Sequence, residues 1–258
     1  MMTTLTTPQT ATVVLLHGSA SSGQMWRRYA DRLVGRRVVA PDLIGYGRAP
    51  SWPAGARLGL DDEVARLREV IAADGPIHLV GYSYGGAVAL AFAAQDPAAV
   101  ASLTLIEPVA FFVLRYARDA AAYAEAAWIR DAFFGDLARG RAETALRSFF
   151  DYWTGAGSWE AMAPPLRQDI LARAGKVRLD WEAVFAADPG REALTALTTP
   201  TLLVHGAAGP RSTTRVIAAL GDVLPAARVL AVPGANHLVP FTHESQLSDA
   251  MLDHWRRP

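Results

Sequence analysis

The chain contains no cysteine among its 258 residues. This absence excludes disulfide bonds, thiolate metal sites and a cysteine nucleophile, although it does not identify the compartment. An excess of charge is missing too, because 25 Lys and Arg residues balance 25 Asp and Glu residues. Without a cluster of like charges, we expect no nucleic-acid partner.

Long apolar runs are also absent, and no stretch approaches the about 20 residues that a membrane-spanning helix needs. The first eight residues have neither the basic start nor the apolar run of a signal peptide. We therefore expect a cytoplasmic protein without a membrane span. Hydrophobic residues make up 51% of the chain, which predicts an ordered protein with a large core.

Short apolar runs alternate with stretches of helical periodicity. The apolar runs predict strands at residues 12–16, 37–40, 77–80, 103–106, 201–204 and 228–232. The periodic stretches predict helices at residues 24–33, 61–73, 84–95, 213–220 and 243–255. Near-continuous apolar strands separated by helices are typical of an α/β fold, with a mostly parallel sheet and helices on both faces.

This alternation stops between Pro108 and Thr199. Residues 108–198 lack strand-like runs and are rich in alanine, arginine and aromatic residues at helical spacing. We interpret them as a helical cap inserted into a core formed by residues 1–107 and 199–258. We expect the cap to provide specificity, with a few of its aromatic side chains lining an apolar pocket.

The segment Gly81-Tyr82-Ser83-Tyr84-Gly85 lies between a predicted strand and a predicted helix. A Gly-x-Ser-x-Gly sequence in this context is the nucleophile elbow of α/β hydrolases, a turn so tight that it needs glycine on both sides of the serine. A plain glycine-rich turn in which the serine caps the helix is the alternative.

Further motifs in the expected order extend the resemblance to the α/β-hydrolase family over essentially the whole chain. His17-Gly18-Ser19-Ala20 follows the first predicted strand and resembles the family's oxyanion loop. Residues 41–48, Pro-Asp-Leu-Ile-Gly-Tyr-Gly-Arg, resemble its Asp-x-x-Gly-x-Gly loop, and residues 233–237 resemble its catalytic-histidine loop. The family usually begins with an antiparallel hairpin. Only about ten residues precede the first predicted strand here, so we expect that hairpin to be shortened or absent.

The resemblance ranks the candidate catalytic residues. Ser83 is the candidate nucleophile, and His237, in a loop after the last predicted strand, is the candidate base that accepts its proton. His17 is expected to brace its own loop. The remaining histidines are assigned structural or surface places: His78 and His205 in the core, His243 at the start of the last helix and His254 at the surface.

Two backbone N–H groups are the candidates for the oxyanion hole. Tyr84 directly follows the nucleophile at a helix N-terminus, where the helix dipole also favours negative charge. Ser19 is the expected second donor, with Ala20 as the alternative. Asp42 also lies near this edge of the sheet, but the matching loop of the family uses it structurally.

The acid of the triad is where this chain departs from the commonest family pattern. Many relatives carry an aspartate shortly after the strand ending in His205-Gly206, where this chain has Gly209 and no acid before Asp222. Glu107 follows the strand after the elbow, and some dehalogenases and lactone hydrolases of the family place their acid there. We therefore assign the acid to Glu107. A salt-bridged residue at the base of the cap is the alternative.

These residues predict a serine hydrolase that cleaves a carboxylic ester or lactone of a small, predominantly apolar molecule, with no cofactor and no metal. The same triad also supports hydrolysis of C–C bonds and cofactor-free perhydrolysis or haloperoxidation. A ligand receptor without enzymatic activity can keep the triad as well, since fold alone does not decide function. The sequence does not determine the oligomeric state, and a homodimer is one of the alternatives.

Overall fold

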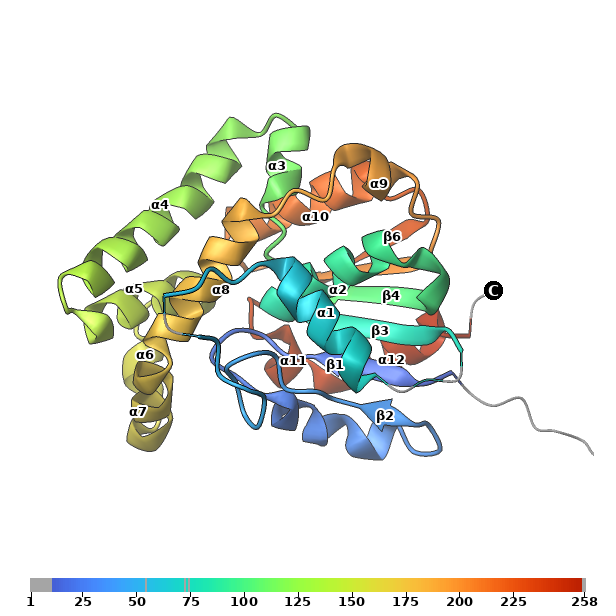
Figure 1. The fold of residues 1–258 in the computed structure, drawn as a ribbon, viewed down its shortest axis with the longest axis horizontal. Coiled ribbons are helices and arrows are strands. Elements are labelled where there is room, and N and C mark those ends of the chain that lie inside the picture. Colours follow the sequence, from blue (N-terminus) through green and yellow to red (C-terminus); the bar gives the residue numbers. More distant parts are fainter. Residues whose placement is uncertain (1–10, 54, 72, 74, 257–258) are drawn as a thin grey trace, which may run out of the picture.

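The computed structural model describes residues 11–53, 55–71, 73 and 75–256. Within them, six strands form one sheet in the order β2-β1-β3-β4-β5-β6, and every neighbouring pair is parallel (Figure 1). The strands are β1 (Val13–Leu16), β2 (Val38–Val39), β3 (Ile77–Tyr82), β4 (Val100–Ile106), β5 (Thr201–Gly206) and β6 (Ala227–Val232). The predicted parallel α/β sheet is confirmed.

Helices cover both faces of this sheet, because alternate strand residues face two separate apolar clusters. Val13 and Leu15 of β1 pack with Trp26 and Met251, whereas Val14 and Leu16 belong to the cluster on the opposite face. The first face is covered by η1 (Gly23–Arg32) and α12 (Glu244–His254), and the second by α1 (Leu60–Val70), α2 (Tyr84–Gln95) and α10 (Arg211–Val223).

The predicted elements differ from the observed ones mainly at their ends. The predicted helix at residues 84–95 has the bounds of α2, and proline at position 97 follows its last turn. The predicted helix at residues 24–33 is a 3₁₀ helix, η1, rather than an α-helix. The sequence did not predict the short helices η2 (Pro97–Ala99) and α11 (Val239–Thr242). The expected shortening of the N-terminal hairpin concerns residues 1–10, which lie outside the described residues.

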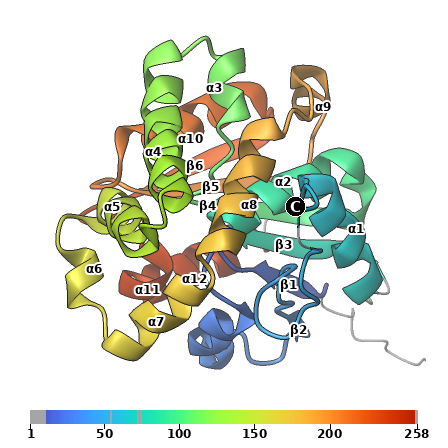
Figure 2. The ribbon, with the colours of Figure 1, turned by 60° about the vertical axis from the view of Figure 1, so that its left-hand side comes forward.

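Between β4 and β5 the described chain forms only helices, here called the α3–α9 segment. Its members are α3 (Phe112–Tyr116), α4 (Ala120–Ala138), α5 (Ala142–Thr154), α6 (Ser158–Ala161), α7 (Pro164–Ala172), α8 (Ala174–Ala186) and α9 (Arg191–Thr195). Figures 1 and 2 show α4 to α7 gathered to one side of the sheet, with α8 leading back toward the core. Over the described residues, no helix combines the length and apolar character needed to cross a membrane.

An aromatic cluster holds the α3–α9 segment together. The Trp181 ring of α8 lies 5.1 Å from Phe149 and 5.9 Å from Trp153, both of α5, measured between ring centroids. Phe111, which follows β4, lies 5.4 Å from the same indole. Because these rings come from the two ends of the segment and from its middle, they fix α5 and α8 against the core.

Candidate active site

Ser83 lies at the turn between β3 and α2 in a backbone conformation that only a tight turn enforces. Its φ is 54° and its ψ is −116°, a left-handed conformation that side chains with a Cβ rarely adopt. A Cβ at Gly81 would lie 2.2 Å from the Gly85 oxygen, and a Cβ at Gly85 would lie 2.4 Å from the His17 oxygen. Both flanking glycines are therefore required by close backbone approach, as the elbow prediction expects.

His237 reaches Ser83 from the loop between β6 and α11. Its Nε2 lies 3.1 Å from Ser83 Oγ, and its side chain is nearly buried. The Tyr82 hydroxyl donates to the His237 carbonyl oxygen at 3.1 Å, and the indole of Trp153 lies 4.7 Å from the imidazole centroid. The histidine is thus held by contacts to both β3 and α5.

Glu107 follows β4 and approaches the other side of the same imidazole. Its Oε2 lies 3.0 Å from His237 Nδ1, and its Oε1 accepts the Gly206 N–H at 2.6 Å. The side chain is fully buried. A Cβ on Gly209 would lie 3.8 Å from Glu107 Oε1. The structure thus brings Ser83, His237 and Glu107 into one hydrogen-bonded line, with the Glu107 carboxylate at the position that faces Gly209.

A sequence model described as the alpha/beta hydrolase fold matches residues 11–244. The chain belongs to the α/β-hydrolase family.

Among relatives of this α/β hydrolase is the lipase LipV of Mycobacterium tuberculosis, 34% identical over 160 residues that cover 60% of the chain and 54% of LipV. A pimeloyl-[acyl-carrier protein] methyl ester esterase of Chromobacterium violaceum is 28% identical over 94% of the chain and 93% of its own length. The first of these matches spans about half of the relative, and matches to two further bacterial lipases span 32% of each.

Solved structures support the same fold. The crystal structure of MGS-M2, an α/β hydrolase from a deep-sea metagenome library of the Medee basin, superimposes with a TM-score of 0.78. The match covers 98% of this chain and 92% of MGS-M2 at 16% sequence identity. At that identity, the similarity establishes the fold of this hydrolase and no more.

A small cavity of about 60 Å³ lies directly above Ser83. Apart from the site residues and the Ser19 loop, its walls are mainly apolar side chains: Tyr82, Val109, Phe149, Phe150, Trp153, Trp181 and Leu238. Drug-sized ligand sites of about 300–1,000 Å³ are several times larger. The α3–α9 segment, which contributes most of the aromatic rings, therefore closes tightly over the serine.

The loop after β1 brings Ser19 to the edge of this cavity. Tyr84, the other predicted donor, is the first residue of α2, and its side chain is buried. Ala20 has a φ of 57°, and its backbone hydrogen-bonds to the Tyr46 hydroxyl. Because Tyr46 engages the Ala20 backbone, Ser19 stays the predicted second oxyanion donor.

Two residues near the site brace its loops. The Leu43 N–H donates to His17 Nε2 at 3.0 Å, and the other ring nitrogen lies 2.7 Å from the Gly18 oxygen. Burial lowers the pKa of His17 to about 4, so the ring stays neutral and donates from Nδ1 to Gly18. Asp42 accepts the Gly23 and Arg48 N–H groups, each at 2.8 Å, which agrees with a structural place for it.

Of the other histidines, His78 and His205 are nearly buried, as expected. His254 was expected at the surface but is only 3% exposed, and its Nε2 lies 3.1 Å from the Leu103 carbonyl oxygen. The surface prediction was wrong because α12 packs its last turn against the sheet, a contact that the spacing of residues in the helix does not reveal.

Sequence reasoning missed a buried charged cluster next to the site. Lys176 and Asp180 of α8 pair with each other, and Lys176 Nζ lies 3.5 Å from Glu63 Oε1 of α1. Burial raises the pKa of Glu63 to about 7 and also raises the pKa of Asp180, while Lys176 opposes both shifts. The four-residue spacing of Lys176 and Asp180 was the available signal, but such pairs are usually solvated.

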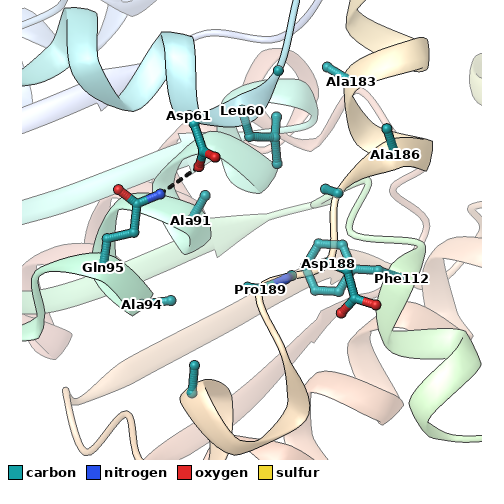
Figure 3. A pocket seen from close by; sticks show the side chains of 13 residues that line it. Leu60, Asp61, Ala91, Ala94, Gln95, Phe112, Ala183, Ala186, Asp188 and Pro189 are labelled. Atoms are coloured by element: carbon teal, nitrogen blue, oxygen red, sulfur yellow. Dashed lines mark hydrogen bonds between the residues drawn. The ribbon is translucent and has the colours of Figure 1, made fainter.

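Another cavity, of about 390 Å³, lies between α1, α2 and α8 (Figure 3). Gln95 Nε2 donates to Asp61 Oδ1 at 2.7 Å at one wall, and Ala183 and Ala186 stand on the opposite wall. None of the residues that line it also lines the cavity above Ser83. It is therefore separate from the candidate active site.

Proposed function

We propose that this protein is a serine hydrolase that cleaves carboxylic esters through an acyl-enzyme. The observation that carries the proposal is the relay in which His237 contacts Ser83 Oγ at 3.1 Å and Glu107 Oε2 at 3.0 Å through its two ring nitrogens. This arrangement gives a serine hydroxyl both a base and a carboxylate that orients the base, which nucleophilic catalysis requires.

In the first half of the reaction, Ser83 Oγ forms a bond to the ester carbonyl carbon while His237 Nε2 takes its proton. The Glu107 carboxylate holds the Nδ1 proton and stabilises the positive charge that develops on the imidazole. Collapse of the tetrahedral intermediate breaks the bond to the alcohol oxygen, which receives the proton from Nε2. The acyl group then remains on Ser83.

In the second half, His237 Nε2 takes a proton from water while the water oxygen attacks the acyl carbon. The bond between that carbon and Ser83 Oγ then breaks, the acid leaves, and Nε2 returns the proton to the serine. The N–H groups of Ser19 and Tyr84 are proposed to stabilise the negative oxygen of both intermediates. One such donor contributes about 2.7–4 kcal/mol of transition-state stabilisation.

We propose that the α3–α9 segment acts as a cap that selects compact, apolar acyl groups. Support comes from the 60 Å³ volume of the cavity and from the aromatic rings of Phe149, Trp153 and Trp181 in its walls. An apolar acyl group gains roughly 25 cal/mol for each Å² that it buries there. The known relatives named as lipases and esterases agree with ester substrates at the level of the family.

The test combines labelling with turnover. A fluorophosphonate probe should add one adduct to the intact protein, and p-nitrophenyl esters of increasing acyl length should be hydrolysed fastest when the acyl group is short. A panel of lactones and a vinylogous 1,5-diketone, run in parallel, tests the lactone and C–C alternatives. A protein that takes up the probe but turns over none of these substrates contradicts the proposed enzyme and supports a ligand receptor.

A further inference from the structure

The loop that carries Ser19 is tied to the α3–α9 segment by a buried carboxylate. The Ser19 hydroxyl donates to Asp180 Oδ2 at 2.7 Å, and the Tyr46 hydroxyl donates to the same oxygen at 2.6 Å. The other oxygen, Oδ1, pairs with Lys176. Asp180 therefore accepts hydrogen bonds on both oxygens, from one lysine of its own helix and from two hydroxyls of the core.

The Asp180 carboxylate lies in the protein interior, where a charge loses its hydration. Asp180 and Glu63 are fully buried, and the side chain of Lys176, which serves both, is only 9% exposed. Replacing buried ion clusters with apolar side chains often leaves a protein as stable or more stable, so packing alone gives no reason for this one. What the cluster does supply is a fixed acceptor for the Ser19 hydroxyl.

The position of that hydroxyl determines the position of the loop. The Gly18 Cα is so close to the elbow that a Cβ on it would lie 3.1 Å from Ser83 Cβ. His17 anchors the start of the loop to the backbone of Leu43. The hydrogen bond from Ser19 Oγ to Asp180 is the second anchor of the loop, and it links the core to α8. A rotation of the Ser19 backbone would break this hydrogen bond to Asp180.

The same stretch of α8 also meets the substrate cavity. Trp181, the residue after Asp180, lines the cavity above Ser83 together with Ser19 itself. One turn of one helix thus contacts both the proposed acyl site and the proposed oxyanion donor. A shift of α8 would change the two together.

We infer that Asp180 is a positioning residue that holds the Ser19 backbone N–H toward the oxygen of the tetrahedral intermediate. The inference rests on the proposed ester hydrolysis. It makes the cap a part of the catalytic apparatus in addition to a wall of the pocket, because the oxyanion donor keeps its place only while α8 is seated.

The experiment compares Ser19→Ala and Asp180→Asn with the wild type. Both variants keep the Ser19 N–H and remove the charge-assisted bond that orients it. A misplacement on the order of 1 Å near reacting groups costs about 10²-fold, so we expect kcat to fall by ~10- to 10²-fold with KM changed by less than about twofold. Affinity for a trifluoromethyl ketone, which forms a tetrahedral adduct on serine, should fall by the same factor as kcat.

Two further variants separate positioning from general loss of structure. Ser19→Thr keeps the hydroxyl and should retain most of the activity. Tyr152→Phe removes another bond between the α3–α9 segment and the core, in which the Tyr152 hydroxyl lies 2.7 Å from Ser212 Oγ, and should leave kcat and the ketone affinity unchanged. The double variant Ser19→Ala/Asp180→Asn should be no slower than the slower single variant, since both remove one bond.

The inference is overturned if Ser19→Ala and Asp180→Asn hydrolyse esters and bind the ketone as Tyr152→Phe does. It is also overturned if their effects fall on KM rather than kcat, or if Ser19→Thr is as slow as Ser19→Ala. These outcomes leave the proposed ester hydrolysis standing, because the wild type remains active. A wild type that neither reacts with a fluorophosphonate nor hydrolyses esters overturns the proposed function and this inference together.

Discussion

Glu107 Oε2 and His237 Nδ1 lie 3.0 Å apart although 130 residues separate them in the sequence. The same carboxylate accepts the Gly206 N–H through its other oxygen, at the end of β5. Three strand ends, those of β4, β5 and β6, therefore meet around one acidic group. This convergence at the carboxyl edge of a parallel sheet is the usual place for a site in such folds.

We predict that Ser83→Ala abolishes both ester hydrolysis and fluorophosphonate labelling without loss of stability, because the hydroxyl faces a cavity rather than the core. A matched control exists in β4, where Ser102 Oγ lies 2.8 Å from His78 Nδ1 but is buried inside the sheet. Ser102→Ala should keep the label. Intact-mass measurement of the labelled variants decides, and an adduct on Ser83→Ala would refute the assignment.

Glu107→Gln should keep the shape of the site but lose the charge that stabilises the His237 imidazolium. Loss of the corresponding carboxylate in serine proteases costs about 10⁴-fold in kcat, so a decrease of at least ~10²-fold is expected here. Steady-state kinetics on a short-chain ester, with the melting temperature as a check on folding, measures the effect. A near-normal kcat in the folded variant would exclude the proposed role.

A carboxylate at position 209, in the loop after β5, should be able to replace that of Glu107. A Cβ at Gly209 would lie 3.8 Å from Glu107 Oε1, and its closest neighbour would be the Gly206 oxygen at 3.3 Å. We therefore predict that Glu107→Ala/Gly209→Asp recovers at least ~10-fold of the kcat that Glu107→Ala loses, through a carboxylate that again orients the imidazole. Glu107→Ala/Gly209→Asn, which adds the same bulk without charge, should stay inactive. Equal rates in the two double variants would contradict the prediction.

Acyl-chain preference should depend on Phe150, which lines the cavity above Ser83. Phe150→Ala enlarges that cavity and should shift the preferred p-nitrophenyl ester toward longer acyl chains. Phe134, also partly buried in the α3–α9 segment, lines a different cavity, so Phe134→Ala is the matched control. An unchanged chain-length profile in Phe150→Ala, or the same shift in both variants, would show that the acyl group does not occupy this cavity.

Stability should depend on pH through Glu63, whose pKa burial raises from 4.5 to about 7. The folded protein keeps a proton that the unfolded chain releases above pH 4.5. The free energy of unfolding contributed by this group is therefore fully present below about pH 4.5 and decreases up to about pH 7, by at most ~3 kcal/mol. Lys176, Asp180 and Tyr84 face the carboxyl group and modulate this loss.

Glu63→Gln should accordingly flatten the dependence of the free energy of unfolding on pH between about 4.5 and 7. Glu69→Gln, on the exposed side of the same helix with a side chain 68% exposed, should leave the slope unchanged. Urea unfolding at several pH values gives both slopes. The same slope in Glu63→Gln and the wild type would show that Glu63 does not carry this linkage.

The sequence by itself determined the features that depend on neighbours in the chain. Apolar runs located all six described strands. The four inner strands show such runs because a strand buried on both faces needs continuous apolar residues, whereas β2 and β6, at the edges of the sheet, are only partly buried. The elbow could be located from Gly81 and Gly85, since no other residue allows the backbone contacts found there. The family motifs, which carry their own order along the chain, then pointed to His237. Glu107 followed from the lack of an acid between Gly206 and Asp222 and from its place after the strand that follows the elbow.

Only the tertiary structure decided the contacts between residues that are distant in sequence. No periodic signal in the chain predicts the hydrogen bond between Ser19 and Asp180, which lie 161 positions apart. The same holds for the burial of His254 and for the closure of Phe149 and Trp181 over Ser83. In the sequence, Asp180 looks like a solvated charge, because α8 carries two basic and two acidic residues. Only the packing of α8 against the core removes its water, and that packing depends on the whole fold.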